Sequence, residues 1–236
     1  MSLKFSRILI KLSGEALMGD QSFGHDRSVM LGICQDIKEA YDLGCQVCIV
    51  VGGGNIFRGS LAITMGIERT TADHMGMLAT CINALAMQSM IEQMGIPIRM
   101  QSSIPMTAIA EQYIRRRAIR HMEKGRIVIF SAGTGHPFFT TDTAASLRAA
   151  ETNCKAIFKA TQVDGVYSSD PKKDFGAQKY SSLSYKDVMD KDLRIMDTAA
   201  ISLAKENKIP ILVFNIRKRG EIARVLTSGG EYSIIS

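Results

Sequence analysis

The sequence predicts an α/β protein, a three-layer αβα sandwich built around a central, mostly parallel sheet. Short apolar segments alternate along the chain with longer helical segments, three of which stop at a glycine. Several of the apolar segments are continuous runs, which is typical of strands covered by helices on both faces. Strand–helix alternation of this kind favours a parallel sheet with helices on both sides.

Seven short apolar segments are expected to form strands. In chain order they are Phe5–Lys11, Gln46–Val51, Ile96–Met100, Arg126–Phe130, Lys155–Ala160, Pro210–Phe214 and, with a weaker pattern, Tyr232–Ile235.

Five helices are expected between these strands. Glycine directly follows three of them, and glycine is the preferred residue just past a helix C-terminus because it accepts a left-handed backbone. The expected helices are Asp26–Leu43, Thr71–Met94, Ala108–Lys124, Thr141–Glu151 and Asp197–Asn207. The polar segment Ser168–Ser184 is expected to be a surface loop. Since no repeat or linker divides the chain, residues 1–236 are expected to form a single domain.

Composition narrows the class of protein. The 236 residues, 46% of them hydrophobic, suffice for a sizeable core. No apolar run approaches the roughly 18 residues of a membrane span, and no signal peptide is recognisable, so a cytoplasmic location is expected. The net charge of +6 suits a protein that handles acidic small molecules. Nucleic acid is not an expected partner, because no aromatic residues interleave with the basic run Arg115–Arg117.

Cysteine and methionine usage points to packing rather than to chemistry. Five cysteines, an odd number, argue against a disulfide framework. Cys45 and Cys48 are expected to point to opposite faces of one strand, which favours core positions over a metal or redox site. Methionines concentrate between Asp73 and Met94, which favours core packing or a subunit interface, and we expect a homo-oligomer.

The most informative segment is Cys45–Gly59, in which an apolar strand leads into three consecutive glycines and then Arg58. Glycine lets backbone N–H groups close on a ligand, and Arg58 can bring a bidentate cation to the same place. Taken alone, the segment is better explained as a glycine-rich turn beside a solvated arginine. In context it indicates an anion-binding loop at the carboxyl end of a strand, where open α/β sheets bind ligands.

Three further segments place polar residues directly after expected strands. Lys11 ends the first strand, Lys159 ends a later one, and Asp142 opens a helix whose N-terminal N–H groups attract anions. The alternatives are a solvated charge at a strand end for Lys11 and a plain cap for Asp142. The flanking residues in these segments are Ser13, Gly14, Thr140, Thr141, Thr161, Asp164 and Gly165.

Loops that follow parallel strands converge on one edge of a sheet. That edge would hold two lysines, an arginine, many backbone donors and a carboxylate, which suits phosphoryl transfer between two phosphorylated molecules. The GxxxxGK[ST] pattern is absent, and so is GxGxxG after the first strand, which disfavours P-loop and Rossmann mononucleotide enzymes.

The same segments resemble the bacterial UMP kinases of the amino acid kinase superfamily. The resemblance runs in order from Lys11 to about Asn215 and rests on KLSGE (11–15), VVGGGNIFRG (50–59), ADHMGMLAT (72–80), SAGTGHPFFTTD (131–142) and KATQVDGVYSSDP (159–171). It implies transfer of the γ-phosphoryl group of Mg²⁺–ATP to UMP in pyrimidine nucleotide biosynthesis. It also implies activation by GTP, inhibition by UTP and a homohexamer.

The resemblance also implies roles for individual residues. The catalytic group comprises Lys11, Arg58, Asp142, which orients the catalytic lysine, and Lys159 as a second cation. The ATP-binding group comprises Lys11, Leu12, Ser13, Gly14, Gly54, Arg58, Thr161, Tyr167 and Asp170. The UMP-binding group comprises Gly53, Asp73 at the ribose hydroxyls, Thr134, Gly135, His136, Pro137, Phe138, Phe139, Thr140 and Thr141. The segment linked to GTP comprises Gly19, Asp20, Gln21, Ser22, Phe23 and Gly24.

Two positions depart from the family pattern. His136 stands where asparagine is usual, and Gln162 replaces a lysine. The first puts base selectivity in question if the side chain makes the contact, and the second weakens one contact on the ATP side.

Three alternatives remain open from sequence alone. Another kinase of the superfamily, such as acetylglutamate kinase or aspartokinase, would use a carboxylate as acceptor, and Asp73 and the FFTTD segment argue against it. A non-catalytic binder like the molybdenum/tungsten storage protein shares the fold, but the presence of both Lys11 and Asp142 favours an enzyme. A nucleic-acid-binding module is the third.

Overall fold

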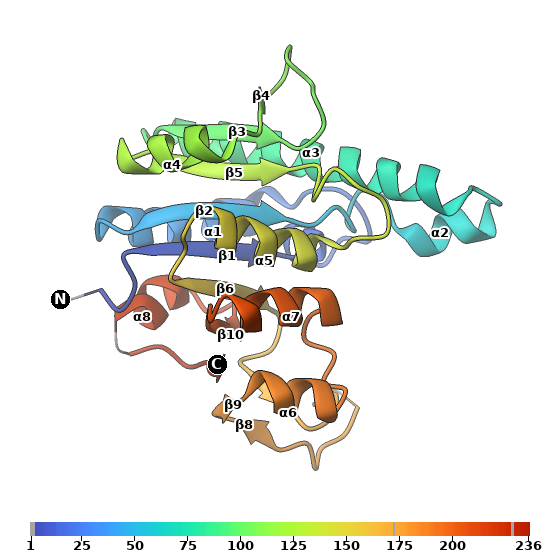
Figure 1. Cartoon of the computed structure of the whole chain (residues 1–236), viewed down its shortest axis with the longest axis vertical. Coiled ribbons are helices and arrows are strands. Elements are labelled where there is room, and N and C mark those ends of the chain that lie inside the picture. Colours follow the sequence, from blue (N-terminus) through green and yellow to red (C-terminus); the bar gives the residue numbers. More distant parts are fainter. Residues whose placement is uncertain (1–2, 172, 228) are drawn as a thin grey trace.

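A computed structural model describes residues 3–171, 173–227 and 229–236, and it has the predicted αβα architecture. Figure 1 shows a central sheet with helices in front of it and behind it. The described strands form a sheet in the order β4-β3-β5-β2-β1-β6-β10-β11-β9. Neighbouring strands are parallel except that β11 runs antiparallel to β10, so the prediction of a mostly parallel sheet is confirmed.

The main strands lie within two residues of their predicted bounds. Their ranges are β1 (Arg7–Leu12), β2 (Gln46–Val51), β3 (Ile98–Ser102), β5 (Ile127–Ser131), β6 (Ala156–Thr161), β10 (Ile211–Asn215) and β11 (Ser233–Ile235). The short edge strands are β4 (Glu111–Gln112) and β9 (Ser182–Leu183), and a separate two-stranded ribbon joins β7 (Val166–Tyr167) to β8 (Lys179–Tyr180).

Each face of the sheet has its own apolar core. One core joins alternate strand residues to α1 (Arg27–Asp42), α3 (Arg69–Gln93) and α8 (Glu221–Thr227). The other joins the intervening strand residues to α4 (Arg115–Glu123), α5 (Thr141–Glu151), α6 (Tyr185–Asp190) and α7 (Thr198–Glu206). Cys45 belongs to the first core and Cys48 to the second, which confirms that their side chains lie on opposite faces.

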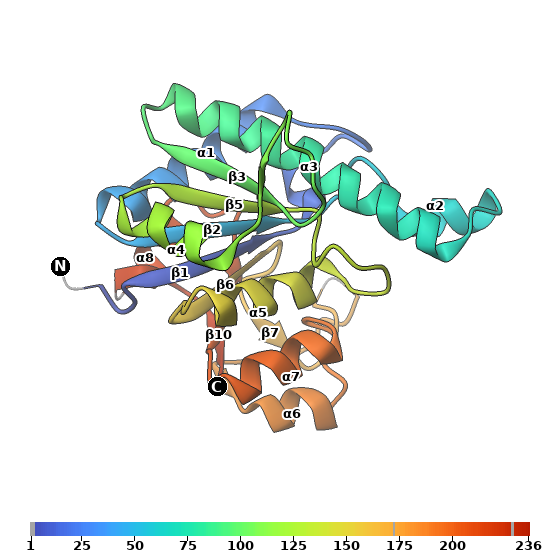
Figure 2. The same cartoon turned by 45° about the horizontal axis from the view of Figure 1, so that its top comes forward.

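The long helix α3 and the short helix α2 (Gly59–Thr64) extend past the carboxyl ends of the strands, as Figures 1 and 2 both show. The loops after β1, β2, β5 and β6 begin at this same edge, because these four strands are parallel neighbours. A 3₁₀ turn, η1 (Gly14–Leu17), follows β1 there. Of the described helices, none is both long and apolar enough to cross a membrane.

One predicted helix begins too early. The segment Ala108–Lys124 is helical only from Arg115, because β4 precedes it and pairs with β3 through Gln101↔Glu111 and Ser102↔Gln112. Pairing with the sheet edge satisfies backbone groups that a helix would otherwise bond. The loop predicted for Ser168–Ser184 also contains the short strands β8 and β9.

Candidate active site

Lys11 and Lys159 lie side by side in the middle of the sheet. They are direct partners in the register of β1 and β6, so both side chains leave the same face. Their neighbours Leu9 and Ile157 pack in the core beneath α5, which identifies that face. Both side chains are nearly buried, with 5% and 12% of their surface exposed.

Asp142 meets both lysines from the start of α5. The helix begins here because the Thr140 hydroxyl caps it, accepting hydrogen bonds from the backbone N–H groups of Asp142 at 3.0 Å and Thr143 at 3.3 Å. One carboxylate oxygen, Oδ1, lies 2.6 Å from the Lys11 ammonium and 2.6 Å from the Lys159 ammonium. The sequence predicted all three residues, and the structure brings them into one contact.

The pKa values in this cluster follow from burial and charge. Burial alone would raise the pKa of Asp142, but the charges of Lys11 and Lys159 outweigh it and lower the pKa to about 2. Burial and the charge of Lys11 lower the pKa of Lys159 to about 8, although Asp142 opposes this shift. With both lysines protonated the cluster carries one excess positive charge, and the N-terminus of α5 adds to it. The cluster is therefore suited to an anion.

A cavity of about 310 Å³ opens beside this cluster, between the glycine loop, α3 and the loop after β5. It is lined by most of the residues that the sequence suggested for an acceptor nucleotide. These are Gly53, Asp73, Thr134, Phe139, Thr140 and Thr141, together with Gly54, which the resemblance placed at the ATP phosphates.

The loop Gly133–Thr140 is tied to α3 at Asp73. Oδ2 of Asp73 accepts the backbone N–H of Phe138 at 2.8 Å, and Arg69 binds the same carboxylate at 3.0 Å. Within the loop, the Thr134 hydroxyl accepts the backbone N–H of His136 at 3.2 Å. The other predicted members of this loop, Gly135, His136, Pro137 and Phe138, are not among the residues that line the cavity.

The glycine loop after β2 packs tightly on the turn after β1. A Cβ on Gly14 would lie 2.8 Å from both the Gly52 carbonyl oxygen and the Gly54 nitrogen, so no side chain fits there. A Cβ on Gly53 would lie 2.8 Å from the Gly76 carbonyl oxygen of α3. The glycines therefore allow three backbone segments to approach one another, which agrees with the close approach expected from the sequence.

Two buried asparagines hold this glycine loop, and the sequence reasoning missed their role. Asn83, in the middle of α3, donates to the Gly52 carbonyl at 2.6 Å and to Oδ1 of Asn55 at 2.7 Å. Asn55 in turn donates to the Gly24 carbonyl at 2.8 Å and accepts, at its own carbonyl, the Gly24 N–H at 2.9 Å. The one signal in the sequence was a polar residue, Asn83, among the apolar and methionine residues of the predicted helix, and the structure shows it to be fully buried.

Arg58 folds back onto the glycine loop. Its Nε donates to the Gly54 carbonyl at 3.3 Å, and its guanidinium pairs with Glu15 at 3.2 Å, with both side chains about half exposed. Arg58 thus joins the loop after β2 to η1. Leu12 is the last residue of β1, Ser13 follows it, and Gly14 is the first residue of η1.

A second group of cavities lies on the other side of Asp142. Asp142 and Asp197 line one of about 460 Å³. The residues Asp192, Leu193, Arg194 and Ile195 separate it from another of about 560 Å³, which Thr161, Tyr167 and Asp170 line. The three residues predicted for the ATP base and ribose therefore share one cavity. Asp197, expected only to start a helix, also accepts a hydrogen bond from the Thr143 hydroxyl at 2.9 Å.

The segment Gly19–Gly24 lies apart from these cavities. Gly19 and Asp20 line a further cavity of about 330 Å³ together with Gln162, Arg217 and Arg219. Phe23 is exposed, and Gly24 is bound to Asn55 as described above. Gln162 therefore points to the cavity beside residues 19–20, whereas Thr161 lines the one with Tyr167.

The fold and the charged cluster agree with what a comparison with protein families finds. The sequence pattern of the amino acid kinase family matches residues 6–215, and the chain belongs to that family.

Its relatives narrow the comparison further. The uridylate kinase of Rickettsia typhi is 57% identical over 234 residues, which cover 99% of this chain and 96% of that protein. The crystal structure of UMP kinase from Bacillus anthracis matches with a TM-score of 0.95 at 42% identity, covering 98% of this chain and 96% of that one. UMP kinase from Ureaplasma parvum matches with a TM-score of 0.93 at 38% identity, over 98% of each chain. The resemblance stated from the sequence is confirmed.

Proposed function

We propose that this protein transfers the γ-phosphoryl group of ATP to UMP and releases UDP and ADP. The observation that carries the proposal is the buried cluster of Lys11, Asp142 and Lys159, which has one positive charge in excess and lies between two sets of cavities. The cavity of about 310 Å³ would hold the acceptor, and the one of about 560 Å³ beside Tyr167 would hold the base and ribose of the donor. The uridylate kinases at 56–57% identity support the choice of acceptor.

The chemistry needs charge neutralisation more than proton transfer. The second pKa of a phosphate monoester is about 6, so the UMP phosphate is largely a dianion at neutral pH. One of its oxygens forms a bond to the γ-phosphorus of ATP as the bond from that phosphorus to the β–γ bridging oxygen breaks. Lys11, Arg58 and the N–H groups of the glycine loop would bind the charge on the transferred group. Asp142 would hold the two lysines in place and accept no proton.

The predicted contact residues divide between the two nucleotides. Gly53, Asp73 and the loop Thr134–Thr141 would bind UMP. Lys11, Leu12, Ser13, Gly14, Gly54 and Arg58 would meet the ATP phosphates, while Thr161, Tyr167 and Asp170 would line the base and ribose. The cavities described above support this division.

Magnesium would enter as part of Mg²⁺–ATP. Mg²⁺ in kinases is held mainly by substrate phosphates and water, with one or two protein carboxylates at most. In the described part of the chain, no three His, Cys, Asp or Glu side chains gather around one point. The residues present suit a metal that arrives on the nucleotide, where it would neutralise phosphate charge.

Regulation and assembly are part of the same proposal. Residues 19–24 would respond to GTP as activator, and UTP would inhibit the enzyme. Residues 1–236 would form one domain, and six such subunits would form a homohexamer in the cytoplasm. The hydrogen bonds between Gly24 and Asn55 support the first of these, because they connect the segment to the glycine loop.

The test is ADP release from Mg²⁺–ATP with UMP, CMP, dTMP and acetylglutamate as separate acceptors. The proposal expects UMP to give by far the highest kcat/KM. A higher value with acetylglutamate would contradict it and favour a carboxylate kinase. Release with no acceptor would favour an ATPase, and no release with any of the acceptors would favour a non-catalytic binder.

A further inference from the structure

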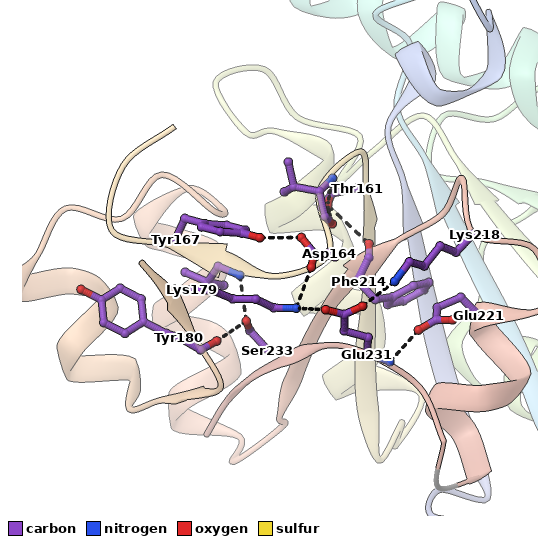
Figure 3. Close-up of polar contacts among 12 residues, drawn as sticks. Thr161, Asp164, Tyr167, Lys179, Tyr180, Phe214, Lys218, Glu221, Glu231 and Ser233 are labelled. Atoms are coloured by element: carbon purple, nitrogen blue, oxygen red, sulfur yellow. Dashed lines mark hydrogen bonds and ion pairs between the residues drawn. The ribbon is translucent and has the colours of Figure 1, made fainter. Parts of the chain in front are cut away.

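A series of charged residues connects Tyr167, which lines the cavity of about 560 Å³, to the C-terminal segment (Figure 3). The proposed function assigns this cavity to ATP, the phosphoryl donor. The Tyr167 hydroxyl donates to Oδ1 of Asp164 at 2.7 Å, and Lys179 donates to Oδ2 of Asp164 at 2.8 Å. The same ammonium lies 2.8 Å from Glu231, whose other oxygen pairs with Lys218. Only Tyr167 among these residues lines the cavity of about 560 Å³.

The ribbon that carries Tyr167 needs such support. Strands β7 and β8 have two residues each and form a sheet separate from the main one. A two-stranded ribbon of this size is marginal in water unless it packs on something else. Side chains from the C-terminal segment supply the contacts, because the Ser233 hydroxyl accepts the Val166 N–H at 2.8 Å and donates to the Tyr180 carbonyl.

Packing directs Lys179 towards the two carboxylates. A Cβ on Gly165 would lie 2.6 Å from Cε of Lys179 and 2.5 Å from the Ser233 hydroxyl, so the lysine stem passes closely over this glycine. Glu231 in turn is bound to helix α8, which packs on the main sheet. The backbone N–H of Glu231 donates to the buried Glu221 of α8 at 2.6 Å.

We propose that Asp164, Lys179 and Glu231 are positioning residues for the phosphoryl donor, because they fix Tyr167 and the β7–β8 ribbon against the wall of the ATP cavity. The inference rests on the proposed function in assigning that cavity to ATP. Glu231 is the most informative member. It lies outside the cavity lining and is joined to Tyr167 through Lys179 and Asp164, so it tests the network and not a direct contact with ATP.

The test compares Glu231→Gln and Lys179→Met with the parent protein. Steady-state kinetics would give KM for ATP and for UMP, and titration calorimetry would give Kd for a non-hydrolysable ATP analogue. We expect both variants to raise KM and Kd on the ATP side about three- to tenfold, the size of one ordinary hydrogen bond, because these residues act on ATP through Tyr167 and not by direct contact. KM for UMP and kcat at saturating ATP should stay within about twofold, since none of the residues in this network lines the cavity proposed for UMP.

Matched controls come from an exposed pair of the same type. Lys186 and Asp190 on α6 form an ion pair whose side chains are 76% and 57% exposed. Lys186→Met and Asp190→Asn should leave both KM values unchanged. Thermal unfolding of all variants separates positioning from stability.

The outcomes distinguish this inference from the proposed function. Unchanged ATP constants in Glu231→Gln, with only a lower Tm, would overturn the inference and leave the proposed function intact. Equal rises in both KM values would also overturn it. If the parent protein phosphorylates an acceptor other than UMP, the proposed acceptor is wrong, but the ATP constants of the variants still decide the role of the network.

Discussion

At the scale of single residues, the shared carboxylate of Asp142 determines how two buried lysines keep their charge. Two ammonium groups side by side repel each other, and burial adds to the cost of charging them. Burial and the neighbouring charge of Lys11 lower the pKa of Lys159 to about 8, and the two lysine charges outweigh burial at Asp142 and lower its pKa to about 2. The arrangement places a titrating cation next to the expected site of phosphoryl transfer.

Activity should therefore decline as the pH rises through about 8. Above that pH Lys159 loses its proton in the free protein, and the cluster loses its excess positive charge. Asp142→Asn removes the carboxylate that stabilises the ammonium, so the decline should move to lower pH. The measurement is kcat/KM for ATP as a function of pH, which reports groups of the free enzyme. Lys159→Met should abolish the decline, and its persistence in that variant would assign it to another group.

The effect of Lys159 on stability has the opposite sign to its expected effect on activity. The pKa of Lys159 is lowered from 10.5 to about 8 on folding, so between these values the unfolded chain binds more protons than the folded one. The contribution of this group to the free energy of unfolding therefore rises with pH in that window. Urea unfolding of the parent protein and Lys159→Met at several pH values would check the sign.

Lys11 and Arg58 should each contribute strongly to the rate. We expect Lys11→Ala and Arg58→Ala to lower kcat by about 10²-fold or more, because each removes a cation that the proposed mechanism assigns to the transferred group. Arg116→Ala, in the exposed start of α4, is the matched control and should keep the parent rate. A near-normal kcat in either test variant would remove that residue from the mechanism.

At the scale of elements, the site depends on how closely the turn after β1 approaches the loop after β2. Gly14→Ala should destabilise the protein by about 1–3 kcal/mol, because the new methyl group would meet backbone atoms of Gly52 and Gly54. Gly76→Ala is the control. A Cβ there meets nothing within 4 Å, and replacing a helical glycine should stabilise α3 by about 0.5–1 kcal/mol. Urea unfolding measures both, and equal stability of the two variants would contradict the packing argument.

Local sequence signals predicted the elements that have them. Strands β1, β2, β5 and β6 were predictable because a short, continuous apolar run is typical of a parallel strand that helices cover on both faces. Helix α5 matched its predicted bounds because Thr140 is a strong cap. The start of α4 was missed because pairing of β4 with β3 is a long-range contact. Helices α2, α6 and α8 have six or seven residues, too few for a periodic pattern to stand out.

At the scale of the whole molecule, the candidate site was predictable where one residue ends a strand and unpredictable where partners come from distant segments. Lys11, Lys159 and Asp142 follow from their positions at strand and helix ends. The contact of Lys179 with Glu231 joins residues 52 positions apart, and no local pattern specifies it. Such contacts depend on tertiary packing, which composition and periodicity do not encode.

The surface of α3 provides the remaining whole-molecule feature. Leu78, Ile82 and Leu85 recur at helical spacing and are each 40–49% exposed, so they form an apolar stripe along one side of the helix. A stripe on a single helix can meet its own copy across a two-fold axis, and the proposed homohexamer would bury it in this way.

Ile82→Glu should therefore disrupt the assembly without unfolding the subunit. A charge at the centre of the stripe would have to be buried unpaired in the interface, whereas on a free subunit it would be solvated and change stability by no more than about 0.5 kcal/mol. Sedimentation velocity should show a smaller species for Ile82→Glu than for the parent protein. Leu31→Glu on α1, an apolar residue of similar exposure outside the stripe, should keep the parent's assembly. If Ile82→Glu sediments like the parent, the contact between subunits lies elsewhere and the stripe is only an exposed apolar surface.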